Sequence, residues 1–269
     1  MDELVVASFN VHGGVDGFGR PFDVVAACEE LDADVLVLQE SWSPAVGKAL
    51  AARVGDALGY RVEELAMTEA RLSAPPASAS APSTWGPAVL QRGPWGLRVG
   101  EGRPGHVPPR WRDTGTVEHG SWGIAVLSRV ALRATATLDL GQLRRDPARR
   151  GAIALEVDIG GRPLRVVGTH VAHLSHGSVL QLRALDRLLA ASETPAVLTG
   201  DMNVWGPPLS ALLPRWTRVV RGRTWPAWRP VAQLDHILVT RGVKVLGRGE
   251  VMPVRGSDHL PVRARVALA

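Results

Sequence analysis

Short runs of apolar and β-branched residues recur along this chain, separated by polar or turn-forming segments. Continuous apolar runs of this length are typical of strands that are buried on both faces of a sheet. The predicted strands cover residues 4–9, 35–38, 124–127, 153–157, 164–167, 196–198, 237–239 and 262–266. Helical spacing lies between several of them: we expect Pro21 to begin one helix, and residues 179–191 form the clearest one. The order of these elements predicts an α/β protein with mixed sheets.

Polar side chains stand where these predicted strands end or begin. Asn10, Glu40, His170, Asp201 and Asn203 follow strands, whereas Asp235, Asp258 and His259 precede the last two. Open α/β sheets bind ligands outside the carboxyl ends of their strands. If all these side chains meet at one edge, the last two strands must run antiparallel to the strands that carry the first group.

Each of these residues also has an ordinary structural interpretation. Asp201 and Asn203 beside a glycine are common turn formers. Glu40 would serve to cap a following helix, and a lone histidine such as His170 is more often structural than catalytic. Turn chemistry does not explain why such residues recur at successive strand ends, so a shared functional site is favoured.

The constellation resembles the endonuclease/exonuclease/phosphatase superfamily, which includes pancreatic-type deoxyribonucleases, abasic-site endonucleases, bacterial sphingomyelinases and inositol polyphosphate phosphatases. The matching stretches, in the family's order, are SFNVHG at 8–13, LQE at 38–40, SWGIAVLS at 121–128, GTH at 168–170, GDMN at 200–203, LDHIL at 234–238 and SDHLPV at 257–262. They leave mainly residues 66–120 unmatched. The resemblance implies a four-layered α/β/β/α sandwich of two mixed sheets with helices outside, in a single domain over residues 1–269. It also implies metal-dependent cleavage of phosphate esters.

The resemblance further implies a metal site in which Glu40 is the principal ligand, with Asn10 and Asp258 nearby. Mg²⁺ suits this chemistry because it takes oxygen ligands, retains water and polarises a phosphoryl oxygen. Mn²⁺ is an alternative ion, and the number of ions, one or two, stays open.

The remaining residues carry catalytic roles by the same resemblance. Asp201 and Asn203 would hold the attacking water and a non-bridging phosphate oxygen. His259, oriented by Asp235, would act as a base or as a phosphate-binding cation. His170 would donate a hydrogen bond or proton to the phosphoryl group or the leaving oxygen. Whether Asp201 or His259 takes the proton of water stays open.

Some positions depart from individual branches of the superfamily. Abasic-site endonucleases use a tyrosine near the phosphate, but Tyr60 is the only tyrosine here and is interpreted as structural, at a helix exit into a strand. His12 stands where those enzymes often place Asn or Asp, so the chain resembles the histidine-using branch. His173 and His176, just past the catalytic histidine, are interpreted as bystanders.

Residues 71–120 form a segment rich in proline, tryptophan and arginine without clear periodicity. Such a stretch is unusual in a compact domain unless it is functional or disordered. We expect a substrate-facing flap, with Arg110, Trp111 and Arg112 among its substrate-binding residues, because cations beside aromatic faces suit single-stranded nucleic acid. The alternative, tryptophans packed on the sheet edge beside solvated arginines, is equally open.

Charge and cysteine usage bound the remaining choices. The net charge of +5 is concentrated in residues 71–269, as a polyanion-binding surface or arginine-rich coding bias would produce. Cys28 is the only cysteine, so no intrachain disulfide forms and a cytoplasmic location is expected. No apolar run is long enough to cross a bilayer, and no signal peptide is apparent. We expect a monomer.

The leading function is a magnesium-dependent phosphodiesterase or nuclease that acts on DNA or RNA. The main alternative keeps the enzyme but makes its substrate a small phosphate ester or a phospholipid headgroup. A third, remote alternative is a binding module that has lost activity.

Overall fold

The computed structural model describes residues 2–17, 19–73, 96–99 and 117–269. Thirteen strands occur among these residues, with the bounds β1 (Glu3–Asn10), β2 (Val35–Pro44), β3 (Arg61–Ser73), β4 (Gly96–Val99), β5 (Val117–Ser128), β6 (Leu132–Gln142), β7 (Arg149–Ile159), β8 (Arg162–His170), β9 (Ala196–Asp201), β10 (Thr217–Arg218), β11 (Asp235–Val239), β12 (Val243–Val251) and β13 (Val262–Leu268). The helices are α1 (Val24–Glu29), α2 (Leu50–Leu58), α3 (Ser178–Ala190) and α4 (Gly206–Leu212), with short 3₁₀ turns at His12–Gly14 and Leu174–His176. Every predicted strand is present.

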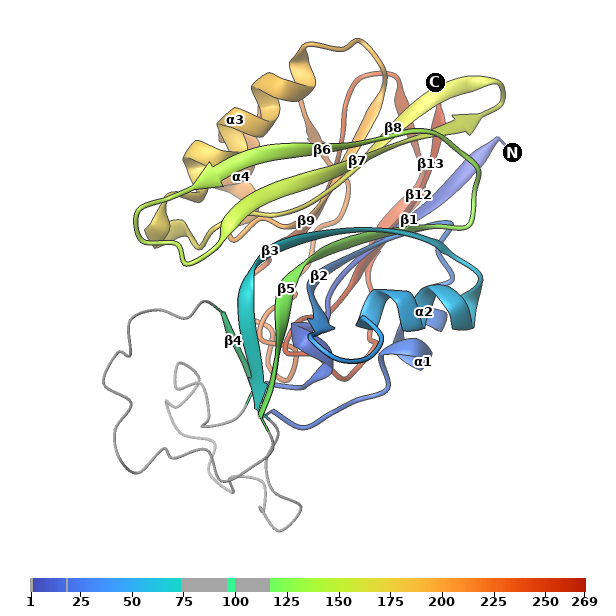
Figure 1. Cartoon of the computed structure of the whole chain (residues 1–269). Coiled ribbons are helices and arrows are strands. Elements are labelled where there is room, and N and C mark those ends of the chain that lie inside the picture. Colours follow the sequence, from blue (N-terminus) through green and yellow to red (C-terminus); the bar gives the residue numbers. More distant parts are fainter. Residues whose placement is uncertain (1, 18, 74–95, 100–116) are drawn as a thin grey trace.

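Within the described residues the strands form two mixed sheets, shown in Figure 1. The first has the order β12-β13-β1-β2-β5-β3-β4, and the second has the order β10-β11-β9-β8-β7-β6. Strand β1 runs parallel to β2 and β8 runs parallel to β9. Strands β13 and β11 run antiparallel to β1 and β9. The predicted strand directions are therefore confirmed.

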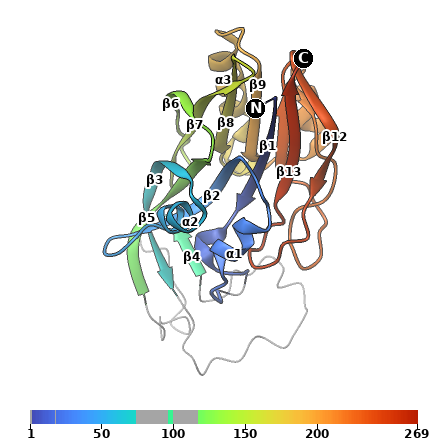
Figure 2. The ribbon, with the colours of Figure 1, turned by 90° about the vertical axis from the view of Figure 1, so that its right-hand side faces the viewer.

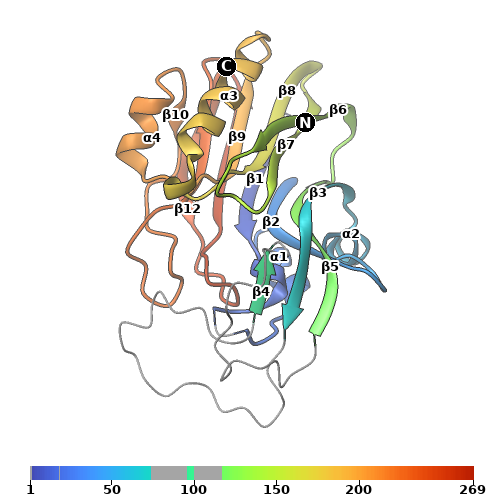
Figure 3. The same cartoon turned by 60° about the vertical axis from the view of Figure 1, so that its left-hand side comes forward.

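The sheets pack face to face with helices on their outer sides. Figure 3 shows α3 and α4 on one side of the sandwich and α2 on the other, and Figure 2 shows α1 beside α2. Gly168 of β8 marks the close approach of the sheets, because an added Cβ would lie 2.6 Å from Val37 of β2 and 2.7 Å from Val126 of β5. The predicted four-layered α/β/β/α sandwich is confirmed.

The first helix begins later than the sequence predicts. Pro21 instead pairs with Val15 in an isolated antiparallel bridge, and α1 begins at Val24. The side chain of Asp23 accepts a hydrogen bond from the amide of Ala26 at 3.1 Å and so caps the helix. A proline can begin a helix, but a capping aspartate two residues later provides the better N-terminus here.

Two irregularities flank Gly123 of β5, an interior strand of the first sheet. On one side β2 bulges between Gln39 and Ser41, and on the other β3 shifts register between Ala66 and Thr68. An added Cβ on Gly123 would lie 2.0 Å from the carbonyl oxygen of Leu65. A side chain at this position would force the strands apart.

The residue that bulges out of β2 is Glu40, which has a positive φ of 55°. The sequence places Glu40 at a strand end, and this is wrong, because β2 continues to Pro44. Bulges re-aim side chains, and non-glycine residues with positive φ are usually held by their surroundings. Glu40 is therefore presented by an interruption of a continuing strand.

We expect Gly123→Ala to destabilise the protein more than Gly59→Ala. Gly59 ends α2 with a φ of 74° and no heavy atom within 4 Å of an added Cβ, so its replacement carries only a backbone cost of roughly 1–2 kcal/mol. Gly123→Ala adds a steric clash with the backbone of β3. Urea unfolding of both variants measures the difference. Equal losses would show that β3 moves aside at little cost.

Candidate active site

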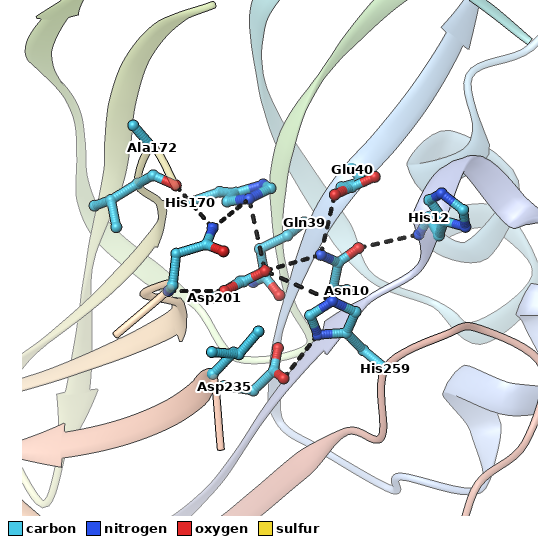
Figure 4. A network of polar contacts seen from close by, with 12 residues as sticks. Asn10, His12, Gln39, Glu40, His170, Ala172, Asp201, Asp235 and His259 are labelled. Atoms are coloured by element: carbon cyan, nitrogen blue, oxygen red, sulfur yellow. Dashed lines mark hydrogen bonds and ion pairs between the residues drawn. The ribbon is translucent and has the colours of Figure 1, made fainter. Parts of the chain in front are cut away.

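Most of the polar residues predicted from strand ends meet in one network of polar contacts, as Figure 4 shows for Asn10, Glu40, His170, Asp201, Asp235 and His259. Asn10, His170 and Asp201 are the last residues of β1, β8 and β9, and Asp235 is the first of β11. These four side chains and that of His259 are buried. Both sheets therefore contribute to one buried polar cluster.

Asn10 connects the two sheets at the centre of this cluster. Its Nδ2 donates hydrogen bonds to Asp201 Oδ2 at 3.1 Å and to Glu40 Oε1 at 3.3 Å. Its Oδ1 accepts a hydrogen bond from the backbone amide of His12 at 3.1 Å. The side chain thus holds a carboxylate from each sheet in a defined position.

His259 and Asp235 form a hydrogen-bonded pair. Nδ1 of His259 donates to Asp235 Oδ2 at 2.8 Å, and its Nε2 lies 3.8 Å from Asp201 Oδ2. Burial by itself lowers the pKa of His259, but the charge and hydrogen bond of Asp235, with the charges of Asp258 and Asp201, raise it well above its ordinary value. His259 is therefore held as an imidazolium that faces Asp201.

Asp201 is surrounded by other carboxylates. Burial raises the pKa of its carboxyl group, the charge of His259 opposes this, and the charges of Asp235 and Glu40 add to the rise. The cluster therefore carries more negative charge than its one imidazolium balances. A cationic ligand at this cluster would relieve the imbalance.

His170 and Asn203 lie on the other side of Asp201. His170 Nε2 is 3.6 Å from Asp201 Oδ2 and 3.4 Å from Asn203 Nδ2. Asn203 has a φ of 51°, its amide donates to Asp201 Oδ1 at 2.9 Å, and its Nδ2 donates to the carbonyl of Val171 at 3.1 Å. Burial, with the charges of Arg150 and His259, holds the pKa of His170 well below its ordinary value. His170 is therefore neutral.

A buried ion pair behind His170 was not predicted from the sequence. Arg150 donates from Nε and Nη2 to Asp146 at 2.8 and 3.1 Å, and from Nη1 to the carbonyl of His170 at 3.4 Å. Its guanidinium lies 4.8 Å from the ring centroid of Trp122, whose ring lies 5.1 Å from that of His170. Trp122 belongs to a family-like motif, but nothing in the sequence separates Arg150 from the many surface arginines.

The proposed metal ligands fall into two linked groups. Glu40 contacts Asn10, whereas Asp258 Oδ1 lies 3.6 Å from Nδ1 of His12. Ser257 joins them, because its hydroxyl donates to the carbonyl of Asn10 at 2.6 Å and its Oγ lies 3.4 Å from Asp258 Oδ1. Ser257 is the first residue of the SDHLPV stretch at 257–262, but no role was predicted for it from the sequence.

A second group of metal-capable side chains lies deeper. Among the described residues, Asp201, Asp235 and His259 offer ligand atoms that all lie within 4.8 Å of one another. This mixed set adjoins the ligands predicted from the sequence, because Asp201 accepts a hydrogen bond from Asn10.

The other sequence interpretations have different outcomes. Arg110, Trp111 and Arg112 lie outside the described residues. Tyr60 is confirmed as structural, since it is buried between α2 and β3 and its hydroxyl donates to the carbonyl of Ala33 at 2.7 Å. The interpretation of His173 and His176 as bystanders stays a prediction. Nδ1 of His173 lies 2.8 Å from Oγ of Ser175, a residue of the 3₁₀ turn Leu174–His176.

Comparisons with known proteins agree with this geometry. The chain belongs to the Endonuclease/Exonuclease/phosphatase family, whose sequence model matches residues 7–259. Members of that family are hydrolytic phosphoesterases that typically use divalent metals. No curated protein sequence matches this chain. Within the described part of the chain, no helix combines the length and apolar character that crossing a membrane requires.

Three solved structures illustrate the shared fold. An endonuclease/exonuclease/phosphatase from Beutenbergia cavernae DSM 12333 is 20% identical, with a TM-score of 0.64 over 100% of this chain and 72% of that one. ANGEL2, a 2′,3′-cyclic phosphatase in complex with adenosine-2′,3′-vanadate, is 15% identical, with a TM-score of 0.66 over 99% and 96%. A mannosyl-6-phosphatase from Bacteroides thetaiotaomicron VPI-5482 is 15% identical, with a TM-score of 0.63 over 98% and 100%. At these identities the likeness concerns the fold.

We expect Asp235→Asn to lower the pKa of His259, because the substitution removes the charge that raises it and leaves the burial that lowers it. In the metal-free wild type, ring-nitrogen NMR should show the imidazolium well above pH 6.5, about the ordinary histidine value. In the variant it should lose its proton at lower pH. The exposed His119 serves as the reference signal in both proteins.

The same pKa shift has a consequence for stability. Because folding raises the pKa of His259, its contribution is fully present below about pH 6.5 and is lost as the pH rises through the folded value. Wild-type stability should therefore fall over this range more steeply than that of Asp235→Asn. If the free energies of unfolding of the two proteins, measured in urea, change in parallel with pH, Asp235 is not the cause of the raised pKa of His259.

Proposed function

We propose that this chain is a divalent-metal-dependent hydrolase of phosphate esters, and that its substrate is a phosphodiester of DNA or RNA. One observation carries the proposal: Asn10 links Glu40 of one sheet to Asp201 of the other, beside the His259–Asp235 pair. Carboxylates, an imidazolium and neutral donors around one point suit an anionic phosphate that must meet water.

The charge of the cluster supports a metal. The negative charges of Asp235 and Glu40 both raise the pKa of Asp201, so a bound divalent cation would reduce the repulsion among these carboxylates. We assign it to Glu40, with Asn10 and Asp258, because hard oxygen donors suit Mg²⁺ or Mn²⁺. The deeper set is less suitable, since the ring of His259 is held as an imidazolium, whose two nitrogens both carry protons and offer no lone pair to a metal. When bound, the ion polarises a phosphoryl oxygen and offsets developing negative charge.

The protein's own side chains then bind the phosphate and accept the proton of the attacking water. Held as an imidazolium, His259 binds a phosphate oxygen, and the carboxylate of Asp201 accepts the proton of the attacking water. As the bond from water oxygen to phosphorus forms, the bond to the leaving oxygen breaks. Neutral His170 and the second Nδ2 proton of the Asn203 side chain donate hydrogen bonds to the phosphoryl and leaving oxygens.

The choice of a nucleic acid rests on charge, since basic side chains outnumber acidic ones in residues 71–269 but not in residues 1–70. A phosphatase acting on a small monoester is the second candidate, favoured by the shared fold of the mannosyl-6-phosphatase. An inactive binding module is disfavoured, because all the proposed catalytic side chains in the described residues are present. The single domain, the flap at 71–120, the monomer and the cytoplasmic location stay predictions.

We expect Glu40→Gln to reduce Mg²⁺-dependent hydrolysis of a generic phosphodiester by about 100-fold or more, as the loss of several kcal/mol of metal stabilisation implies. Folding should change little, because Glu40 is only half buried and lies in a bulge. Glu30→Gln, on an exposed residue after α1, is the matched control. Near-normal activity of Glu40→Gln would remove Glu40 from the metal site.

A double-mutant cycle tests the histidine pair. His259→Ala should lower kcat by orders of magnitude, and Asp235→Asn by less, because the imidazole remains but loses its orientation and charge. The double variant should lose about as much as His259→Ala alone. If the two losses instead add as free energies, the residues act independently.

A further inference from the structure

A pocket of about 610 Å³ lies beside the candidate active site. Its walls come from three loops and include Asp16, Arg20, Trp228, Pro230, Arg255 and Leu260. We call it the Trp228 pocket. Its volume lies within the range of small-molecule sites and exceeds what a phosphate group alone requires.

The Trp228 pocket shares a wall with the active site. Ser257 lines the pocket and also donates to the carbonyl of Asn10 at 2.6 Å. Ala227, another lining residue, donates from its amide to the carbonyl of Asp258 at 2.7 Å. The loop that carries Asp258 and His259 therefore forms part of the pocket wall, through Ser257 and Leu260.

Gly17 brings the indole of Trp228 up to this shared wall. A Cβ on Gly17 would lie 2.6 Å from Trp228 Cζ3 and 3.2 Å from Asp258 Cβ. Only a glycine permits the ring and the Asp258 loop to approach each other this closely. The indole is thereby set next to a proposed metal ligand and is half buried.

The lining of the pocket selects a ligand type. Trp228, Pro230 and Leu260 offer apolar surface, and the indole suits stacking by a flat ring. Arg20 is paired with Asp16, its Nη2 lying 2.6 Å from Oδ2, whereas Arg255 is exposed at the rim. An aromatic face beside guanidinium groups is how proteins hold the bases of single-stranded nucleic acids.

We propose that the Trp228 pocket binds the nucleoside on one side of the scissile phosphate, with its base stacked on Trp228 and Arg255 at the polar edge. This assignment rests on the proposed function, because it requires the phosphate to lie at the Asn10–Asp201–His259 cluster. It makes the enzyme selective for nucleotide esters over simple alkyl esters of the same phosphate.

Two substrates that differ only in this group provide the test. Thymidine 5′-(4-nitrophenyl) phosphate and methyl 4-nitrophenyl phosphate both release 4-nitrophenolate, so the chemical step is matched. The wild type should favour the nucleoside ester in kcat/KM. Trp228→Ala should lower that preference about tenfold, the size of one base–aromatic contact, while the methyl ester reports an intact catalytic centre.

Further variants protect the test against misfolding. Trp228→Phe should retain most of the preference because it keeps an aromatic face. Arg255→Gln, on an exposed side chain, should show a smaller loss. Trp205→Ala is the matched control, since Trp205 is 59% exposed on a different loop. In each protein, isothermal titration of thymidine 5′-phosphate without metal gives a readout that needs no turnover, and Trp228→Ala should weaken it about tenfold.

The outcomes separate the two proposals. If neither ester is hydrolysed with Mg²⁺ or Mn²⁺, the proposed function fails, while Trp228-dependent binding of thymidine 5′-phosphate would still support the pocket as a nucleoside site. If the wild type hydrolyses both esters equally well, or Trp228→Ala keeps the preference, the pocket assignment is overturned. Loss of the preference in Trp205→Ala with its retention in Trp228→Ala would likewise overturn the pocket assignment.

Discussion

The hydrogen bond from Asn10 Nδ2 to Asp201 Oδ2 joins the last residues of two strands that belong to different sheets. Both side chains are buried, so this contact exists only if the two sheets pack in one relative position. Glu40 Oε1 accepts a hydrogen bond from the same side-chain amide, Asn10 Nδ2. A buried polar network of this kind is costly when partly satisfied, and it therefore specifies a single arrangement of the sandwich.

The electrostatics of the cluster follow from that arrangement. The pairing of β9 with β11 sets Asp201 beside Asp235, and bringing the sheets together buries this pair and adds Glu40; the burial and these carboxylate charges raise the pKa of Asp201. The same packing places His259 beside Asp235, whose charge keeps the imidazole protonated. Desolvation alone would neutralise every one of these groups. The close spacing of opposite charges is what preserves an imidazolium next to carboxylates, and the uncompensated negative charge favours a cation.

Backbone irregularities complete the site at some cost in stability. Glu40 and Asn203 both have positive φ angles, near 55° and 51°. Gly123 and Gly17 make room where a side chain would collide with β3 or with Trp228. Strained or tightly packed positions of this kind cluster where geometry serves binding or catalysis, since ordinary packing does not require them.

The sequence by itself determined the eight predicted strands, including all those that carry the site, and most of the cluster, because an apolar run that ends in Asn10, His170 or Asp201 marks a strand end locally. Strands β3, β4, β6, β10 and β12 were not among them. Only the tertiary structure decided the rest. Glu40 lies in a bulge that depends on β5, and Arg150 is recognisable as buried only once it packs behind His170. The Trp228 pocket requires three loops distant in sequence to meet. Such features depend on contacts between segments, which no local pattern of residues encodes.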